Sequence, residues 1–195
     1  MGATWFTSDT HFGHAKMLRV VGRPFRSVAE MDEALITRWN EVVGRSDDVW
    51  HLGDFSFMGS GSMDAVRARL NGRIHLVRGN HDTDLPQRSP ELFASVHDIA
   101  ELDLAGQMLV LCHYPMREWP KAWRGAWHLF GHVHGRLDDA PLGHSLDVGV
   151  DSHDYRPIGM ERIAQLMSTR VSPFTSEESR DEMHRRIART RTQAK

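Results

Sequence analysis

Short apolar runs that end in polar or glycine-containing turns are the main pattern along this chain of 195 residues. Such runs predict buried β-strands. They lie at residues 4–8, within 47–55, within 73–82, and at 96–104, 107–113, 126–132 and 145–150. The last four runs follow one another closely, and Ala105-Gly106 between two of them predicts a β-hairpin.

Apolar residues at helical spacing occur in three other segments. The first begins after Ser27, which is predicted to cap a helix with Glu30 as its capping-box partner. A second helix is predicted to be capped by Ser62 and to end near Asn71-Gly72, and a shorter third one covers residues 159–168. Residues 9–18, between the first strand and the first helix, are predicted to form a loop.

The order of these elements predicts the fold. Strands alternate with helices in the first half and follow one another in the second half, which indicates two mixed β-sheets packed as a sandwich with helices outside. We therefore expect an α+β fold with four layers, α/β/β/α, in one domain covering 1–170. Residues 171–195 are acidic first and basic later, with few large apolar side chains, and are predicted to form a charged tail, helical or frayed.

Charge and composition exclude several classes of protein. The 24 Lys and Arg residues nearly balance the 26 Asp and Glu residues, so no overall field attracts a polyanion or a membrane surface. No apolar stretch approaches the ~20 residues that cross a bilayer. The only cysteine, Cys112, excludes an internal disulfide and suits a reducing compartment. We expect a soluble cytoplasmic protein, monomeric or homodimeric, and the 13 histidines favour metal or proton-transfer chemistry.

Polar residues stand directly after five of the apolar runs. They are Asp9-x-His11, Gly53-Asp54, Gly79-Asn80-His81-Asp82, His113 and Gly131-His132-x-His134. Strands that end at one edge of a sheet bring such residues to a single crevice. Two carboxylates, four imidazoles and one amide oxygen are too many ligands for one ion and suit two. A pair of ions needs a bridging anionic ligand, and Asp54 is our choice for it.

The five motifs, in this order, resemble those of the calcineurin-like metallophosphoesterases, and the stretches "TSDTHFGH", "RPF" and "HYP" resemble small stand-alone members of that superfamily. The resemblance spans Asp9 to His134 and implies a β-sandwich flanked by helices. It also implies the ligand sets. The first ion would be held by Asp9, His11 and His134, the second by Asn80, His113 and His132, and both by Asp54.

The resemblance also implies catalytic roles. His81 would be the histidine that is not a ligand and that protonates the leaving oxygen, with Asp82 orienting it. Phe12 departs from the family pattern, which often has glycine directly after Asp-x-His. The neighbouring His14 either contacts the substrate phosphate or is a solvated loop histidine.

Other residues are candidates for substrate binding, each with a structural alternative. Asn80 is counted here as well as among the ligands. Arg78 either reaches a phosphate oxygen or forms a surface salt bridge. Trp119 and Trp123 recur four residues apart among cationic side chains, which suits base stacking, but tryptophans also commonly fill a core.

These features predict a dinuclear metal-dependent phosphoesterase, in which ions bind the phosphate oxygens and lower the pKa of water from ~15.7 toward ~7 to give the attacking hydroxide. The mixed ligand set suits divalent transition metals, with manganese as first choice and Fe, Zn, Co or Ni as alternatives. A phosphodiester is preferred because so short a chain leaves an open groove, and a nucleotide or single-stranded nucleic acid is one substrate class. The alternatives are a phosphomonoesterase and a non-catalytic metal-binding interaction module of the same fold.

Overall fold

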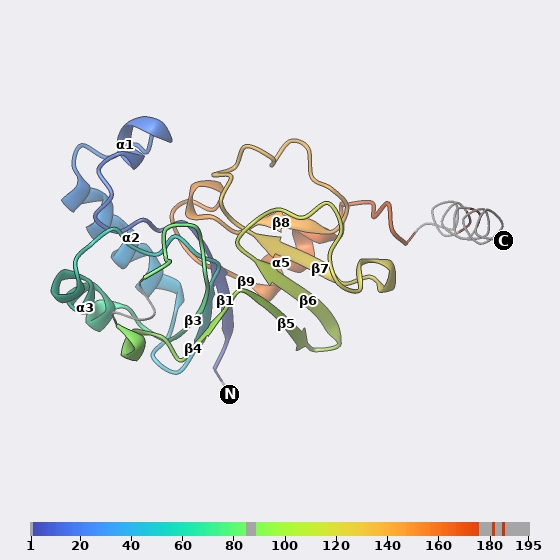
Figure 1. Ribbon diagram of the computed structural model, residues 1–195, viewed down its shortest axis with the longest axis horizontal. Coiled ribbons are helices and arrows are strands. Elements are labelled where there is room, and N and C mark those ends of the chain that lie inside the picture. Colours follow the sequence, from blue (N-terminus) through green and yellow to red (C-terminus); the bar gives the residue numbers. More distant parts are fainter. Residues whose placement is uncertain (1, 85–88, 176–180, 182–184, 186–195) are drawn as a thin grey trace.

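Two β-sheets pack face to face in the computed structural model, which describes residues 2–84, 89–175, 181 and 185 (Figure 1). In this part of the chain the first sheet has five strands. In spatial order they are β4 (Ser95–His97), β3 (Arg73–Val77), β2 (Asp48–His51), β1 (Thr4–Thr7) and β9 (Ile158–Gly159). Only β9 runs antiparallel to its neighbour, so this sheet is mixed.

The second sheet has four strands among the described residues. In spatial order they are β5 (Ile99–Leu104), β6 (Gln107–Cys112), β7 (Trp127–Phe130) and β8 (Ser145–Asp147). The β5–β6 pair is antiparallel, whereas β6, β7 and β8 are parallel. Both sheets are therefore mixed, and the predicted fold class, two mixed sheets in a sandwich with flanking helices, is confirmed.

Helices flank the sandwich. Within residues 2–84 and 89–175 the α-helices are α1 (Met17–Val20), α2 (Val28–Val42), α3 (Ser60–Arg69) and α5 (Met160–Met167). Short 3₁₀ turns are η1 (Pro90–Leu92), η2 (Ala122–Arg124) and η3 (Val150–Ser152). Figure 1 shows α2 and α3 beside the first sheet, on the side away from the second sheet.

Alternation along the strands divides the hydrophobic core into layers. In β3, Ile74 and Leu76 face α2 and α3, whereas Val77 joins the layer between the sheets. In β6, Leu111 faces that inner layer, whereas Val110 faces outward. The outward layer of the second sheet contains Val110, Trp119, Ala122, Ala126 and Phe174. A 3₁₀ segment and its flanking loops thus cover this face.

The start of α2 confirms the predicted cap but only half of the capping box. Ser27 Oγ accepts a hydrogen bond from the backbone N–H of Glu30. The Glu30 carboxylate accepts from the N–H of Arg26 instead of that of Ser27. It also pairs with the Arg26 guanidinium, and this charged partner draws the side chain one residue further back. The predicted cap of the next helix at Ser62 is wrong, since Ser62 lies inside α3, which begins at Ser60 with Gly59 at its N-cap position.

The run at 96–104 is a second correction. It forms two strands, because β4 pairs with β3 in the first sheet and β5 pairs with β6 in the second. The chain passes from one sheet to the other at Asp98, between the two strands. The predicted loop at 9–18 ends in a helix instead, because α1, a single helical turn, begins at Met17. The hairpin at Ala105-Gly106 is confirmed, with both residues in the left-handed conformation at φ 53° and 85°.

Predictions for the C-terminal tail beyond 175 concern residues that, apart from 181 and 185, lie outside the described part of the chain. Phe174, before them, is buried against Trp119. No helix in the described residues is long and apolar enough to span a bilayer.

Candidate metal centre

Turns that follow the parallel strands bring the polar motifs together. The turn after β1 carries Asp9 and His11, and it lies against the turn after β2 through hydrogen bonds from Asp9 N to Gly53 O at 2.9 Å and from His11 N to Asp54 O at 3.0 Å. The turn after β7 is joined to the turn after β1, because His132 N donates to Asp9 Oδ2 at 2.8 Å. The ends of the two sheets therefore form one site, as predicted.

The backbone at this site is strained. Five of the motif residues have left-handed φ angles between 50° and 71°, namely Asp9, His11, Asp54, His132 and His134. Residues other than glycine adopt this region at a cost, although Asp and His tolerate it better than most. Such outliers cluster at functional sites, where the surrounding structure enforces them.

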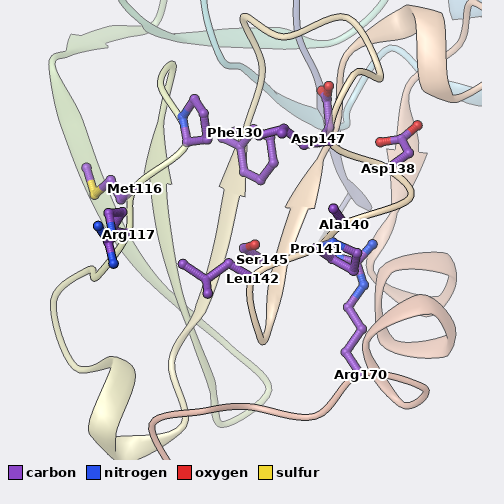
Figure 2. Close-up of a pocket in the computed structure, with 12 residues that line it drawn as sticks. Met116, Arg117, Phe130, Asp138, Ala140, Pro141, Leu142, Ser145, Asp147 and Arg170 are labelled. Carbon is purple, nitrogen blue, oxygen red and sulfur yellow. The ribbon is translucent and has the colours of Figure 1, made fainter.

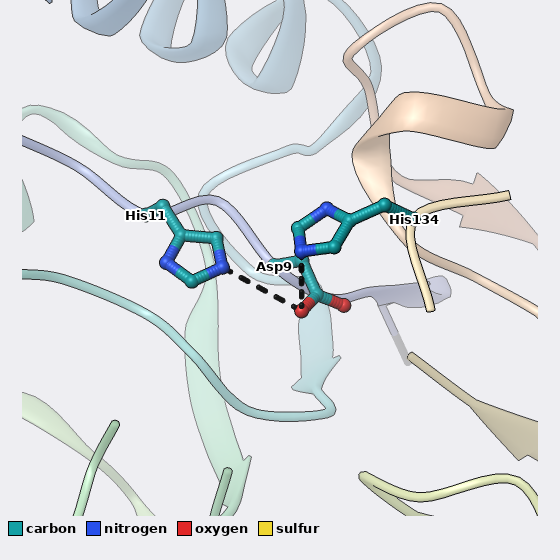
Figure 3. A group of neighbouring side chains, drawn as sticks. All are labelled: Asp9, His11 and His134. Carbon is teal, nitrogen blue, oxygen red and sulfur yellow. Dashed lines mark ion pairs between the residues drawn. The ribbon is translucent and has the colours of Figure 1, made fainter. Parts of the chain in front are cut away.

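One group of donors consists of Asp9, His11 and His134 (Figure 3). Asp9 Oδ1 lies 3.7 Å from His11 Nε2 and 3.9 Å from His134 Nε2. Asp9 and His11 are buried and His134 is partly buried. Burial alone would raise the pKa of Asp9, but the imidazoles of His11, His113 and His134 hold that pKa below its usual value. The Asp9 carboxylate is therefore charged and surrounded by imidazoles.

The second group consists of Asp54, His113 and His132. Asp54 Oδ2 lies 3.7 Å from His113 Nε2. The Asn80 amide is beside them, with its Oδ1 atom 3.0 Å from His113 Nε2. All the predicted ligands of the second ion are thus adjacent in the structure.

Asp54 lies between the two groups. Its Oδ2 atom is 3.5 Å from His11 Nε2 in the first group and 3.7 Å from His113 Nε2 in the second. Its other oxygen, Oδ1, accepts a hydrogen bond from His81 N at 2.9 Å, which fixes the carboxylate. This position is the one a bridging ligand needs.

The donor atoms are arranged as ligands of a cation and not as hydrogen-bond partners of one another. Asp9 Oδ1 and His11 Nε2 are buried and have no hydrogen-bond partner within the described chain. Buried polar atoms without partners are rare and indicate a missing ion or water. Ligand atoms at about 2.0–2.3 Å from one ion lie ~3–4 Å apart, as these do. The residues present therefore fit divalent metal ions.

Hydrogen bonds from the other ring nitrogens aim the imidazoles. His113 Nδ1 donates to Leu52 O at 2.7 Å, and His134 Nδ1 donates to Asp151 Oδ2 at 2.7 Å. Each bond leaves the Nε2 lone pair directed at the site, as is usual for histidines that bind metals. The carboxylate of Asp151 also raises the pKa of His134, against the effect of burial.

Arg23 and Asp151 form a support that the sequence did not predict. Arg23 is 3% exposed and makes two hydrogen bonds to the Asp151 carboxylate, both at 2.8 Å. It also donates to the carbonyl oxygens of Asp9 at 2.6 Å and Thr10 at 3.0 Å. One guanidinium thus holds both the strained turn and the partner of His134. The "RPF" stretch was the available signal, but nothing in it indicates the partner 128 residues away.

Two glycines leave room for the site. A Cβ at Gly53, where φ is 96°, would lie 2.5 Å from Gly79 N and 2.6 Å from His113 Nδ1. A Cβ at Gly131 would collide with Ser8 Oγ and Asp9 Oδ2. Larger residues would therefore displace His113 and Asp9.

His81 lies at the open side of the site. Its side chain is 43% exposed, and its Nε2 atom is 3.9 Å from Asp54 Oδ2. The expectation that Asp82 orients this ring is not met. Asp82 is fully buried and accepts hydrogen bonds from the backbone N–H groups of Asp54 at 2.6 Å, Phe55 at 3.0 Å and Gly79 at 2.9 Å. Those three donors occupy the carboxylate, which therefore joins the turns after β2 and β3.

His14 is a partner of His11 and not a solvated histidine. Its Nδ1 atom lies 3.3 Å from His11 Nδ1, and its ring stacks on Phe57 with centroids 3.6 Å apart. Burial and the nearby imidazoles of His11 and His81 lower the pKa of His14 to about 4. A neutral His14 can accept a hydrogen bond from His11, which again leaves His11 Nε2 free for the site.

The remaining candidates for substrate binding have other partners. Arg78 pairs with Asp98 at 2.9 Å, which is the salt-bridge alternative. Trp119 is 3% exposed and donates its indole N–H to Ala126 O at 2.8 Å. Trp123 packs on Phe174 with centroids 5.5 Å apart. The core alternative therefore describes Trp119, and a buried ring has no free face for a base.

We expect Trp119→Ala to affect stability and not substrate choice. Truncation of a buried tryptophan leaves a cavity and costs about 3–5 kcal/mol of unfolding free energy. Urea denaturation measures that loss, and rates on nucleotide and non-nucleotide esters should keep their ratio. A normal midpoint with a changed ratio would instead restore the stacking role.

A pocket of about 300 Å³ lies over the two donor groups. Asp54, Asn80 and the imidazoles form its polar side, and α1 supplies an apolar wall that includes Val20, which is 76% exposed. Arg136 also lines the pocket and has no ion-pair partner among the described residues. An organic group and an anion could both be bound here, and sequence patterns gave no sign of Arg136.

Comparisons with known proteins agree with this geometry. A protein-family model described as "Calcineurin-like phosphoesterase superfamily domain" matches residues 4–144 of the chain. An uncharacterized protein of Methanocaldococcus jannaschii is 32% identical over 174 residues, 86% of this chain and 92% of that protein. The gene 66 protein of Mycobacterium phage D29 is 31% identical over 198 residues, 86% of this chain and 97% of the phage protein. A solved structure from Aquifex aeolicus, a protein of unknown function, has a TM-score of 0.69 and 25% identity, covering 84% of this chain and 98% of that one.

Proposed function

The chain belongs to the calcineurin-like phosphoesterase superfamily, and from this premise we propose that it is a dinuclear metal-dependent phosphodiesterase. The observation that carries the proposal is the position of Asp54 Oδ2, 3.5 Å from a donor of one group and 3.7 Å from a donor of the other. A single carboxylate oxygen between two donor groups is what a pair of neighbouring ions requires.

The donor residues divide into ligands of the two ions. Asp9, His11 and His134 would hold one ion, Asn80, His113 and His132 the other, and Asp54 both. When bound, such ions neutralise phosphate oxygens and acidify water. We keep manganese as first choice among the divalent transition metals, because imidazole and carboxylate ligands together suit this class. The hydrogen bonds of His113 and His134 keep the imidazoles oriented before the substrate arrives.

His81 supplies the proton for the leaving oxygen. Its ring is at the open side of the pocket, 5.7 Å from the His11 ring between centroids, and it lines the pocket together with Asn80. Its Nε2 atom faces Asp54 Oδ2 at 3.9 Å, so a proton held there is close to the centre. General acid help of this kind contributes about 10²- to 10⁴-fold.

A diester fits the site better than a monoester. Val20, Tyr114 and Phe57 are all exposed near the centre, at 76%, 45% and 42%, so the site is open to groups on both sides of a phosphate. Tyr114 lies 4.9 Å from the His132 ring, and Phe57 lies 4.6 Å from the His81 ring. These two rings, not Trp119, are the available surfaces for a nucleobase.

The free thiol of Cys112 suits the cytoplasm as location.

Metal reconstitution tests the proposal. Protein stripped with a chelator should be inactive on bis-p-nitrophenyl phosphate and should recover on addition of Mn²⁺, with two ions bound per chain. Mono-p-nitrophenyl phosphate, measured on the same preparation, decides between diester and monoester. Absence of activity with each of Mn, Ni, Co and Zn would favour the interaction-module alternative.

Arg136 should contribute to substrate binding. Because this cation at the pocket has no ion-pair partner among the described residues, it can bind a phosphate oxygen. Arg136→Gln should therefore raise KM about tenfold, the effect of losing a charge-assisted hydrogen bond of ~1.5 kcal/mol. Arg162→Gln on α5 makes the same charge change outside the pocket lining and is the matched control. Equal effects of the two variants would mean that only overall charge matters.

A further inference from the structure

A second pocket opens on the outer face of the second sheet (Figure 2). Its volume is about 270 Å³, and among the described residues it shares no lining side chain with the pocket over the metal centre. Phe130 of β7 and Ser145 and Asp147 of β8 form the floor. Segments 115–117 and 137–142 contribute the walls.

The walls are apolar and partly open to solvent. Leu137 is 38% exposed and Leu142 is 40% exposed, although both border the buried ring of Phe130. Large apolar side chains that stay exposed around a hollow mark binding surfaces more often than isolated ones do. An apolar body of ligand size would cover them.

Two arginines, Arg117 and Arg170, and two aspartates, Asp138 and Asp147, line the pocket, and the arginines are the groups in it that can bind an anion. Figure 2 shows Arg117 and Arg170 on opposite sides of Phe130 and Leu142. Arg170 is half-buried, and its Nη1 atom is buried without a hydrogen-bond partner in the described part of the chain. Asp138 also lines the pocket but forms no ion pair with Arg170 among these residues. A guanidinium in this state has donors left for an anionic acceptor.

We propose that this pocket binds an amphipathic anion, with an aromatic or branched apolar body on Phe130, Leu137 and Leu142 and an anionic group bound by Arg170. The planar fork of arginine matches a carboxylate, sulfonate or phosphate group. Such binding does not depend on the proposed phosphoesterase activity.

The floor of the pocket is connected to the metal centre. Asp147 accepts hydrogen bonds from Gly135 N at 2.9 Å and from Gly149 N at 2.7 Å. Gly135 directly follows His134, and Gly149 precedes η3, which contains Asp151. An occupant that contacts Asp147 therefore touches the residue that holds both backbone segments, and their amide groups can report on binding.

The experiment uses 1-naphthoic acid as probe and its neutral amide, 1-naphthamide, as matched ligand. Each is titrated by calorimetry into the metal-free full-length protein, and the amide NMR signals of Gly135 and Gly149 are followed in parallel. We expect 1:1 binding of the acid, about tenfold tighter than the amide because of one charge-assisted contact. Arg170→Gln should remove this preference, whereas Arg162→Gln should keep it.

A second variant separates the apolar contribution from the charge. Leu142→Ala should weaken acid and amide by the same factor, because it removes contact with the body of both ligands. Far-ultraviolet circular dichroism of each variant shows whether it is folded. The proposal is overturned if the acid does not saturate a single site, if Arg170→Gln leaves the preference unchanged, or if the two glycine signals stay in place while other regions shift.

Discussion

Asp54→Asn is expected to weaken the binding of both metal ions and thereby to abolish most of the phosphoesterase activity. The substitution keeps the shape of the side chain and an oxygen that can accept from His81 N, but it removes the charge between the two donor groups. Even changes to groups that only support metal ligands cost 10- to 100-fold in affinity. A shared ligand should therefore cost at least ~100-fold, measured by calorimetric titration of Mn²⁺ into the chelated protein.

The control for this experiment is Asp98→Asn. Asp98 is a solvent-exposed carboxylate that pairs with Arg78 outside the metal pocket. The Asp98→Asn substitution should leave the affinity for both ions and the rate of hydrolysis unchanged. If Asp54→Asn still bound two ions with the affinity of the original protein, the shared-ligand assignment would be wrong, and a single lost ion would restrict Asp54 to one group.

His81→Ala is expected to lower kcat by about 10²- to 10⁴-fold while both ions remain bound. The ring is not part of either donor group, and its exposed position allows removal without a cavity in the core. The fall should depend on the leaving group. A p-nitrophenolate leaves readily without a proton, whereas an alkoxide needs one, so the loss should be larger for an alkyl phosphodiester than for bis-p-nitrophenyl phosphate.

His97→Ala in β4 is the matched control, because this imidazole bonds Ser95 Oγ and does not line the metal pocket. It should leave kcat unchanged. An equal loss with both substrates in His81→Ala would assign His81 to substrate binding and not to proton transfer. Loss of bound metal in the His81→Ala variant would show that His81 is a metal ligand.

The fold and the set of polar residues at the strand ends could be predicted from sequence because their signals are local, whereas the division of these residues into two donor groups came from the family resemblance. Each strand carries its apolar run, and each run ends directly in the polar residues that it positions, as in the pair His132 and His134. Parallel strands then bring such ends together without further information. The α2 cap at Ser27 is equally local, since its acceptor and donor are three residues apart.

What the sequence did not predict depends on distant contacts. The apolar run at 96–104 is continuous, and only pairing with two different sheets divides it at Asp98. The Arg23–Asp151 support joins residues far apart in the chain. The pattern around Trp119 is the same for a buried ring and an exposed one, and only packing against Phe174 decides between them. Asp82 follows His81 in sequence, yet its acceptor atoms are taken by backbone amides.

The left-handed turns at the metal centre lower the thermal stability of the fold, although the residues in them are needed for activity. Five residues, among them Asp9 and His134, adopt φ angles that glycine or asparagine would adopt at less cost. Replacing any of them with glycine would relax the turn of the ion-free protein, and the same exchange would delete a donor atom. Selection for thermal stability alone would therefore favour glycine at these positions. The resulting protein would be more stable but would lack metal ligands, so only selection for activity keeps the strained residues in place.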